Sequence, residues 1–287
     1  MSEEFTYQWN PEDEDGPILK VTKSSLSTFY WCNKQYEFNY IEKRPQDTSE
    51  AMLKGTIVHN SYEEFYKAVD VDEITDYSKD ELHEYFYSLF PIDDYGYVYD
   101  TIVALEADRF DRSKKLGMPF LPAGNEVRLN GRYIVEQNSN PKYPLRQDYT
   151  VHLQGIIDRI FLEDGKYILM ELKTGIWKDS KRSNMRAEMA YYKLLIEQAT
   201  DEELIENGLD PNIPVTHWGW FYPDSNFLYV EDCVKASQTA VRKKFAKLIQ
   251  SYETGVFPAS YYYKKCVHCA YMPICDAAIE NQLFDDW

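Results

Sequence analysis

Two acidic residues and a lysine lie on either side of a short predicted turn. Asp164-Gly165 favours a two-residue type I′ turn, which needs positive φ at both central positions. If that turn is used, the numbers of paired residues sum to 329, and Asp158 lies directly opposite Glu171. Opposed residues share one face of a sheet, with Cβ atoms roughly 4.5–5.5 Å apart. Lys173 lies on that face too, because side chains alternate along a strand.

Asp158 and Glu171 predict a divalent metal site. Facing carboxylates repel one another, so a positive group belongs between them, and their oxygens suit Mg²⁺ or Mn²⁺. Such an ion helps to ionise a water and neutralises charge on a phosphorane-like transition state. Lys173 would stabilise the attacking hydroxide or the phosphoryl oxygens, and His59, on a predicted helix, would complete the metal shell. Each residue alone also has an ordinary structural explanation; two carboxylates facing each other do not.

Two further groups have weaker patterns. Glu188 and Tyr192 are one helical turn apart, which fits either a site-facing pair or a plain amphipathic helix. Lys178, Lys181 and Arg182 form a basic segment that reads either as a solvated loop or as local positive charge beside a nucleic-acid cleft.

Three of the five cysteines crowd into Cys266-x2-Cys269-x5-Cys275. In a reducing compartment such clustering favours a metal or cluster site over disulfides. Four thiolates hold either structural zinc or an iron–sulfur cluster, and the fourth must come from Cys32 or Cys233. Zinc ligands usually form two close couples, whereas one distant cysteine with a C-terminal triplet suits a cluster that clips the chain ends together. Ordinary buried thiols are the alternative, above all for Cys233.

Composition sets broad limits on partners and location. The 287 residues carry a formal net charge of -17, which argues against non-specific polyanion binding by the whole chain but leaves room for a local basic groove. No apolar run approaches the ~18–20 residues of a membrane span. Met1-Ser2-Glu3-Glu4 lacks the basic and apolar regions of a secretory signal. We therefore expect a cytoplasmic protein with no membrane partner.

Hydrophobic periodicity predicts an α/β chain that follows an acidic, flexible tail over residues 1–21. A helix from Thr22 would be capped by Ser24 or Ser25, and a second would run from Gly55 to about Val69. The other expected helices are 72–117, broken near Pro91 and Gly96, then 185–198 and 234–254. The expected strands are 126–137, 149–162, 166–174, 214–222 and 227–232.

In their order along the chain, these residues resemble the PD-(D/E)XK nucleases of the RecB type. That order is His59, Gly155-Ile156-Ile157-Asp158, Glu171-Leu172-Lys173 and Glu188-x3-Tyr192. The resemblance implies that His59, Asp158 and Glu171 bind the catalytic metal and that Lys173 assists catalysis. One residue differs from the family pattern: Glu188 stands where the family has Gln. Glu126 is similar to a further acidic position upstream of the strand that carries Asp158, but the sequence gives it no role.

The two ends of the chain add to the resemblance, which spans residues 22 to 276. Leu26-Ser27-Thr28-Phe29-Tyr30-Trp31-Cys32-x3-Tyr36-x-Phe38-x-Tyr40 looks like the N-terminal motif. Cys32 with Cys266, Cys269 and Cys275 resembles the iron-staple branch, which holds a [4Fe–4S] cluster. That branch includes AddB-type helicase–nucleases and small CRISPR-associated RecB-like exonucleases. This chain has no helicase motif, so it is similar to the stand-alone nucleases.

The resemblance implies a restriction-endonuclease-like core, a mixed sheet flanked by helices, with an N-terminal helical part and a C-terminal Fe–S clasp. We expect one nuclease domain over residues 22–276 and a tail over 277–287. It further implies a Mg²⁺- or Mn²⁺-dependent exonuclease that hydrolyses single-stranded DNA or DNA ends in recombination, repair or CRISPR adaptation, with proteins of those pathways as partners. The alternatives are a non-catalytic DNA-binding or adaptor subunit and, ranked last because no dinucleotide fingerprint is present, an oxidoreductase.

Overall fold

A computed structural model describes residues 18–46 and 48–285 of the chain, with side chains described up to residue 281. The chain forms two compact units. The first combines the N-terminal segment to Asp47 with Gly131–Gln154 and the segment from Thr239; the second combines Thr48–Asn130 with Gly155–Gln238. One domain over residues 22–276 stays a prediction. No helix in the described ranges is long and apolar enough to cross a membrane.

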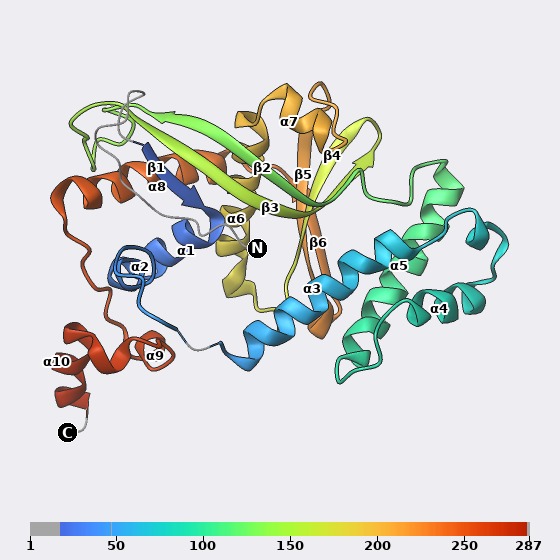
Figure 1. The fold of residues 1–287 in the computed structure, drawn as a ribbon, viewed down its shortest axis with the longest axis horizontal. Coiled ribbons are helices and arrows are strands. Elements are labelled where there is room, and N and C mark those ends of the chain that lie inside the picture. Colours follow the sequence, from blue (N-terminus) through green and yellow to red (C-terminus); the bar gives the residue numbers. More distant parts are fainter. Residues whose placement is uncertain (1–17, 47, 286–287) are drawn as a thin grey trace. The chain divides into compact units, whose positions relative to one another are not determined.

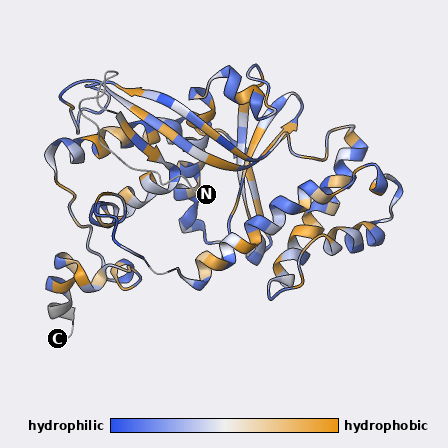
Figure 2. Ribbon diagram, viewed as in Figure 1, coloured by the Kyte–Doolittle hydropathy of each residue, from blue (hydrophilic) through white to orange (hydrophobic). Residues whose placement is uncertain are grey.

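The second unit contains a mixed sheet, as predicted. The part of β3 that lies in this unit pairs antiparallel with β4, β4 pairs parallel with β5, and β5 pairs antiparallel with β6 (Figure 1). The strands are β2 (Gly124–Val135), β3 (Tyr149–Glu163), β4 (Lys166–Leu172), β5 (Val215–Tyr222) and β6 (Phe227–Asp232). The long strands β2 and β3 pair with each other and continue into the first unit. Figure 2 shows hydrophobic and hydrophilic residues alternating along both.

Helices cover both faces of this sheet. Those of the second unit are α3 (Glu50–Ala68), α4 (Lys79–Ser88), α5 (Gly96–Leu116), α6 (Arg182–Gln198) and α7 (Asp201–Glu206). On one face, α3, α4 and α5 share an aromatic core with the sheet residues Phe161, Leu172 and Phe221. On the other face, α6 packs close to β3. These are the layers of a restriction-endonuclease-like core.

The β3–β4 hairpin has the predicted turn. Asp164 and Gly165 have φ values of 50° and 69°, both positive as a type I′ turn requires. The regular ladder runs from Glu163–Lys166 to Arg159–Met170, and each pair sums to the predicted 329. The ladder ends one step short of Asp158 and Glu171, so the predicted pairing of these two residues is not part of it.

Gly155 permits the close approach of α6 to β3. A Cβ atom placed there would lie 3.0 Å from Leu195 Cδ2 and 3.4 Å from Tyr192 Cε1, both on α6. Glycine at the start of the Gly155–Asp158 segment is therefore a packing requirement. It brings the face of α6 that carries Tyr192 down onto the strand that carries Asp158.

The first unit is built on a short parallel strand pair. β1 (Ile18–Thr22) pairs with Thr150–Gln154 of β3, so residues 18–21 are a strand and not part of the predicted tail; the rest of that tail lies outside the described residues. Helices follow: α1 (Lys23–Trp31), α2 (Asn33–Tyr36), the π-helix η1 (Glu37–Ile41), α8 (Lys235–Thr254), α9 (Tyr263–Cys266) and α10 (Asp276–Asp285). α10 occupies most of the segment expected to be a C-terminal tail.

Two helix starts differ from prediction. Thr22, rather than Ser24 or Ser25, caps α1, because its hydroxyl accepts from Ser25 N while the Ser25 side chain accepts from Thr22 N in a reciprocal capping box. α3 begins at Glu50 and not at Gly55, because the Ser49 side chain caps it by accepting from Met52 N. Gly55 is thus inside the helix.

Candidate active site

Asp158 and Glu171 lie at the end of the β3–β4 hairpin, and both are buried. Asp158 Oδ2 accepts a hydrogen bond of 2.7 Å from the backbone N–H of Leu172. The Asp158 carboxylate is thereby fixed against β4 where the regular ladder ends. A buried carboxylate held in this way is oriented in advance for binding a ligand.

Lys173 is the positive group beside these acids. Its ammonium donates to Glu171 Oε1 at 2.6 Å and lies 3.0 Å from Glu188 Oε2. Glu188 comes from α6, so the lysine joins the strand that carries Glu171 to the helix behind it. The predicted contact between Lys173 and Glu171 on one face is present. The cation lies against Glu171 rather than midway between the two strand carboxylates.

His59 reaches the same place from α3. Its Nε2 lies 3.1 Å from Leu172 O and its Nδ1 lies 3.6 Å from Asp158 Oδ2. Burial lowers the pKa of the imidazole, although Asp158 and Glu171 oppose this. A carbonyl can only accept, so a neutral His59 donates through Nε2 and turns the lone pair of Nδ1 toward a carboxylate. Two acceptors that face each other at this distance are suited to a shared cation.

Glu126, to which the sequence assigns no role, is part of this cluster. One ligand atom from each of His59, Glu126 and Asp158 lies within 4.8 Å of the others. Among the described residues, buried Oε1 of Glu126 has no hydrogen-bond partner. Burial, and then the charge of Asp158, raises the pKa of Glu126 to about 7. Its φ is 52°, a conformation that is costly for a residue with a side chain. The family resemblance singled out Glu126 but gave it no role, because strand patterns reveal neither its φ nor its neighbours.

Glu188 and Tyr192 both face the site from α6. Tyr192 is buried, and burial, reinforced by the charges of Glu171 and Asp158, raises the pKa of its phenol well above the usual value. The phenol is therefore neutral at all ordinary pH values. Of the two interpretations left open by the sequence, the site-facing pair is the one that the geometry supports.

Asp224 ties α3 to the segment that follows β4. Lys54 of α3 forms an ion pair with Asp224, and Asp224 Oδ2 accepts from Gly175 N at 2.6 Å. Although burial disfavours ionisation of Asp224, these two donors lower the pKa of its carboxyl. The helix that carries His59 and the loop that follows Lys173 are thus held by one carboxylate.

Comparison with known proteins gives a family that agrees with this geometry. The family model described as "PD-(D/E)XK nuclease superfamily" matches residues 20–276. The chain belongs to the PD-(D/E)XK nuclease superfamily. A search of curated proteins gives no significant match. The solved structure titled "Crystal structure of SSO0001" is 12% identical, with a TM-score of 0.44 over 90% of this chain and 87% of that chain; this likeness is too weak to decide any role.

The basic segment of this PD-(D/E)XK protein is engaged with local groups. Lys181 donates to Ile176 O at 2.7 Å and lies over the ring of Tyr222, and Arg182 pairs with Asp179. Lys178 is exposed at this end of α6. Beside them Trp177 stacks on Phe227, with ring centroids 4.5 Å apart. Tyr222, which Lys181 covers, is close enough to the candidate site for the charges of Lys173, Glu188 and Glu171 to act on its phenol.

Four cysteines gather in the first unit of this superfamily member. Cys32, Cys266, Cys269 and Cys275 are free thiols that line one small cavity. Burial raises the pKa of the Cys269 thiol, a hydrogen bond from the Tyr271 backbone opposes this, and the other three thiols raise the pKa further. Within the described ranges, they form no group with sulfurs as close as 4.8 Å, as a single-ion site would need. Cys233 belongs to the second unit, where its Sγ lies 4.0 Å from Val215 O.

Proposed function

We propose that this superfamily member is a Mg²⁺- or Mn²⁺-dependent deoxyribonuclease of the RecB type. The observation that carries the proposal is the convergence of His59, Asp158, Glu171 and Lys173 at the end of one hairpin. His59 comes from α3, 99 or more positions before Asp158, Glu171 and Lys173, yet all four meet in a largely buried group of mixed charge. A merely structural role would not require an acidic cluster so costly to bury.

The residues fit a divalent ion. The buried Glu126 Oε1 without a hydrogen-bond partner, and the Nδ1 lone pair of His59 turned toward Asp158, are donors that a hard cation satisfies. His59, Asp158 and Glu171 would hold the ion, with Glu126 as an additional oxygen ligand. When bound, such an ion supplies a Lewis acid and lowers the pKa of a bound water.

Side chains of the protein would complete the site around the metal ion. Lys173, already held by Glu171 and Glu188, is placed to stabilise an attacking hydroxide or the phosphoryl oxygens of a substrate. Tyr192, neutral and buried, keeps the floor of the pocket dry. Glu188 adds a second carboxylate to Lys173 where the family has an amide, so it would position the lysine by charge as well as by hydrogen bonding.

DNA ends are the substrate that we propose, with exonucleolytic cutting in recombination, repair or CRISPR adaptation. Lys178, Lys181 and Arg182 would supply local positive charge to a chain whose overall charge repels DNA. The neighbouring Trp177–Phe227 stack supports this, because exposed bases stack on aromatic side chains.

One nuclease assay tests the proposal. Purified protein with Mg²⁺ or Mn²⁺ is expected to shorten end-labelled single- or double-stranded DNA, and Asp158→Ala or Lys173→Ala is expected to reduce the rate at least about 10²-fold. Arg128→Ala, an exposed cation outside the cluster, serves as the control and should cut normally. Unchanged cutting by both site variants would refute the assignment. DNA binding without cutting under any metal would favour the non-catalytic adaptor instead.

We further propose that Cys32, Cys266, Cys269 and Cys275 hold a structural [4Fe–4S] cluster. Four free thiols around one cavity, too far apart for a single ion, support a cluster rather than zinc. Ser260 N donates to Cys32 Sγ at 3.4 Å, the kind of hydrogen bond that stabilises thiolate sulfur. Brown protein with broad absorption near ~400 nm is expected; colourless protein with stoichiometric zinc would refute iron.

A further inference from the structure

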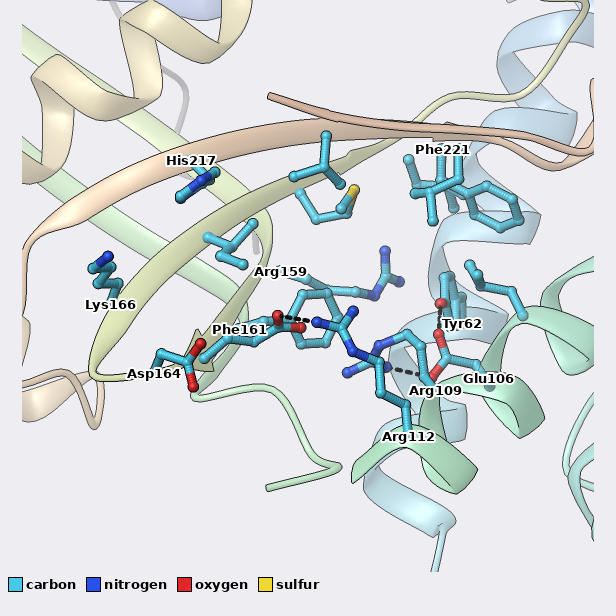
Figure 3. A pocket seen from close by; sticks show the side chains of 17 residues that line it. Tyr62, Glu106, Arg109, Arg112, Arg159, Phe161, Asp164, Lys166, His217 and Phe221 are labelled. Atoms are coloured by element: carbon cyan, nitrogen blue, oxygen red, sulfur yellow. Dashed lines mark hydrogen bonds and ion pairs between the residues drawn. The ribbon is translucent and has the colours of Figure 1, made fainter. Parts of the chain in front are cut away.

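A second cavity in the second unit opens on the face of the sheet that points away from Glu171. It encloses about 350 Å³ between α5 and the strands β3, β4 and β6 (Figure 3). Along β4, Ile168, Met170 and Leu172 face this cavity, whereas Glu171 faces α6 and the metal-binding cluster. Pockets for small ligands usually enclose about 300–1,000 Å³, so the space is large enough for one.

Arg159 is a buried cation at this cavity. Its side chain is 1% exposed, and in the described part of the chain it has no ion pair, while Nε and Nη2 have no hydrogen-bond partner. Its guanidinium rests on the ring of Tyr62, with Cζ 3.6 Å from the ring centroid. The favourable energy of a cation–π contact offsets only part of the hydration free energy that a buried guanidinium loses. The site is therefore short of an anion.

Two of the acids that line the cavity, Glu106 and Glu163, are already engaged by other groups. The Glu106 carboxylate accepts from Tyr62 and from Arg109, and Glu163 Oε2 accepts from Arg112 at 3.0 Å. Figure 3 shows these pairs as dashed lines and shows none to Arg159. Shifting either acid to Arg159 would leave another arginine unpaired, so the surplus charge would only move.

The charges that line the cavity leave an excess of one positive charge. Its cations are Arg109, Arg112, Arg159 and Lys166, and its acids are Glu106, Glu163 and Asp164. His217 also lines it, but this residue pairs with Asp232 at 3.0 Å. A ligand with a single negative charge would balance the site, whereas a polyanion would not be matched.

The rest of the lining is apolar. Phe161 and Phe221 lie deep, and Leu228 and Val230 of β6 stand at the mouth, 43% and 42% exposed. Apolar side chains exposed beside a cavity favour a ligand with an apolar or aromatic body.

We propose that this cavity binds a small organic monoanion. The anionic group, a carboxylate or a phosphodiester, would pair with Arg159, and an apolar or aromatic body would lie against β4 and β6. This inference does not require the nuclease assignment, because the lining of the cavity contains no residue of the metal-binding cluster, although the charge of Arg159 also acts on Glu126.

Titration calorimetry and thermal unfolding of the full chain test the proposal with three probes: octanoate, diphenyl phosphate and inorganic phosphate. Either organic probe should bind saturably and raise the midpoint by about 2–4 °C at tenfold its Kd. Binding of octanoate alone would identify a carboxylate ligand, and binding of diphenyl phosphate alone would identify a phosphodiester. No saturable binding of either organic probe up to about 10 mM, or equally tight binding of inorganic phosphate, would overturn the proposal.

Variants connect any binding to this cavity. Arg159→Met should weaken the organic probe at least about tenfold while leaving the midpoint of the ligand-free protein unchanged or higher, because it removes a buried unpaired charge. Arg128→Met, the same change at an exposed position, should bind normally. Val230→Glu places a like charge at the exposed mouth and should also weaken binding, so the test holds even if Arg159→Met does not fold. Wild-type affinity in both cavity variants would contradict the proposal.

Discussion

Glu126 combines three features that rarely occur in one residue: positive φ, a buried oxygen without a hydrogen-bond partner, and a pKa raised to about 7. Each is unfavourable in the metal-free protein. A bound cation would compensate the oxygen without a partner and the raised pKa, but not the positive φ. The residue therefore links the stability of the protein to occupancy of the site.

Without metal, Glu126→Gln should become stabilising as the pH rises. The folded-state pKa of Glu126 lies above its usual value, so its contribution is fully present at low pH and is lost as pH rises toward 7. From about pH 5.5 to about pH 8, the unfolding free energy of the variant relative to wild type should grow by about 1–2 kcal/mol, allowing for partial exposure.

Urea denaturation in EDTA at both pH values measures this difference. Glu206→Gln, at an exposed acid at the end of α7, is the control and should change the unfolding free energy by the same amount at both pH values. A constant difference across the pH range would contradict the assigned burial of Glu126. Saturating Mn²⁺ should reverse the order, since the metal stabilises the ionised wild-type carboxylate.

At this scale the sequence predicted the turn of the hairpin and its register as far as Arg159–Met170. Asp158, Glu171 and Lys173 followed from one turn and a two-residue period, which depend only on local backbone geometry. Glu126 did not, because its role depends on a left-handed φ and on a strand that pairs from a distant part of the chain. Arg159 could not be singled out either, since a charged residue in a strand shows its lack of a partner only after folding.

Among the elements, the contact of α6 with β3 matters most for the site. Gly155→Val should destabilise the protein by about 1–3 kcal/mol, because the added atoms would meet Leu195 and Tyr192 on a packed helix. Activity per folded molecule should fall as well, since a displaced α6 moves Glu188 away from Lys173.

Denaturant unfolding and a nuclease assay at matched folded fractions measure the two effects. Gly165→Ala, at an exposed turn with open space around it, is the control: it should cost stability through its positive φ but leave activity per folded molecule unchanged. Normal stability and activity in Gly155→Val would mean that the close packing has no functional role.

Helices and strands were predicted well where the sequence has clear periodicity and residues that end an element. The helices near 79–116 and the strands of the β3–β6 sheet were placed within a few residues, because Pro91, Gly96 and clear periodicity delimit them. β1 was missed: five residues beside an acidic tail carry little pattern, and its pairing with Thr150–Gln154 is a long-range event. The helix that starts at Glu50 was placed late because its capping residue, Ser49, lies in a polar segment without periodicity.

For the molecule as a whole, the cysteine group would join α1 to the C-terminal segment across more than 230 residues. A link that closes so long a loop restricts the unfolded chain strongly. Cys275→Ser should therefore lower iron content and destabilise the protein by about 2–5 kcal/mol. Cys233→Ser is the matched control, since Cys233 does not line the cavity and should affect neither.

Iron analysis and thermal unfolding of the two variants, purified without oxygen, are the measurements. Equal loss of stability in both variants would point to ordinary buried thiols.

At this scale the sequence predicted the fold class and the family, which the ordered motifs define together. It did not predict the division into two compact units, because both are assembled from separated segments. The direction in which DNA would be cut and the biological pathway also leave no local pattern in the sequence.

The central claim is that one divalent ion is held by His59, Asp158 and Glu171. Crystals of the active protein grown with Mn²⁺ and measured at the manganese edge test this directly. We predict an anomalous peak within about 2–2.5 Å of Asp158 and Glu171 oxygens and a His59 nitrogen, and no peak there in Asp158→Ala. A manganese-dependent enzyme whose peak lies elsewhere, or whose Asp158→Ala variant keeps it, would contradict the account.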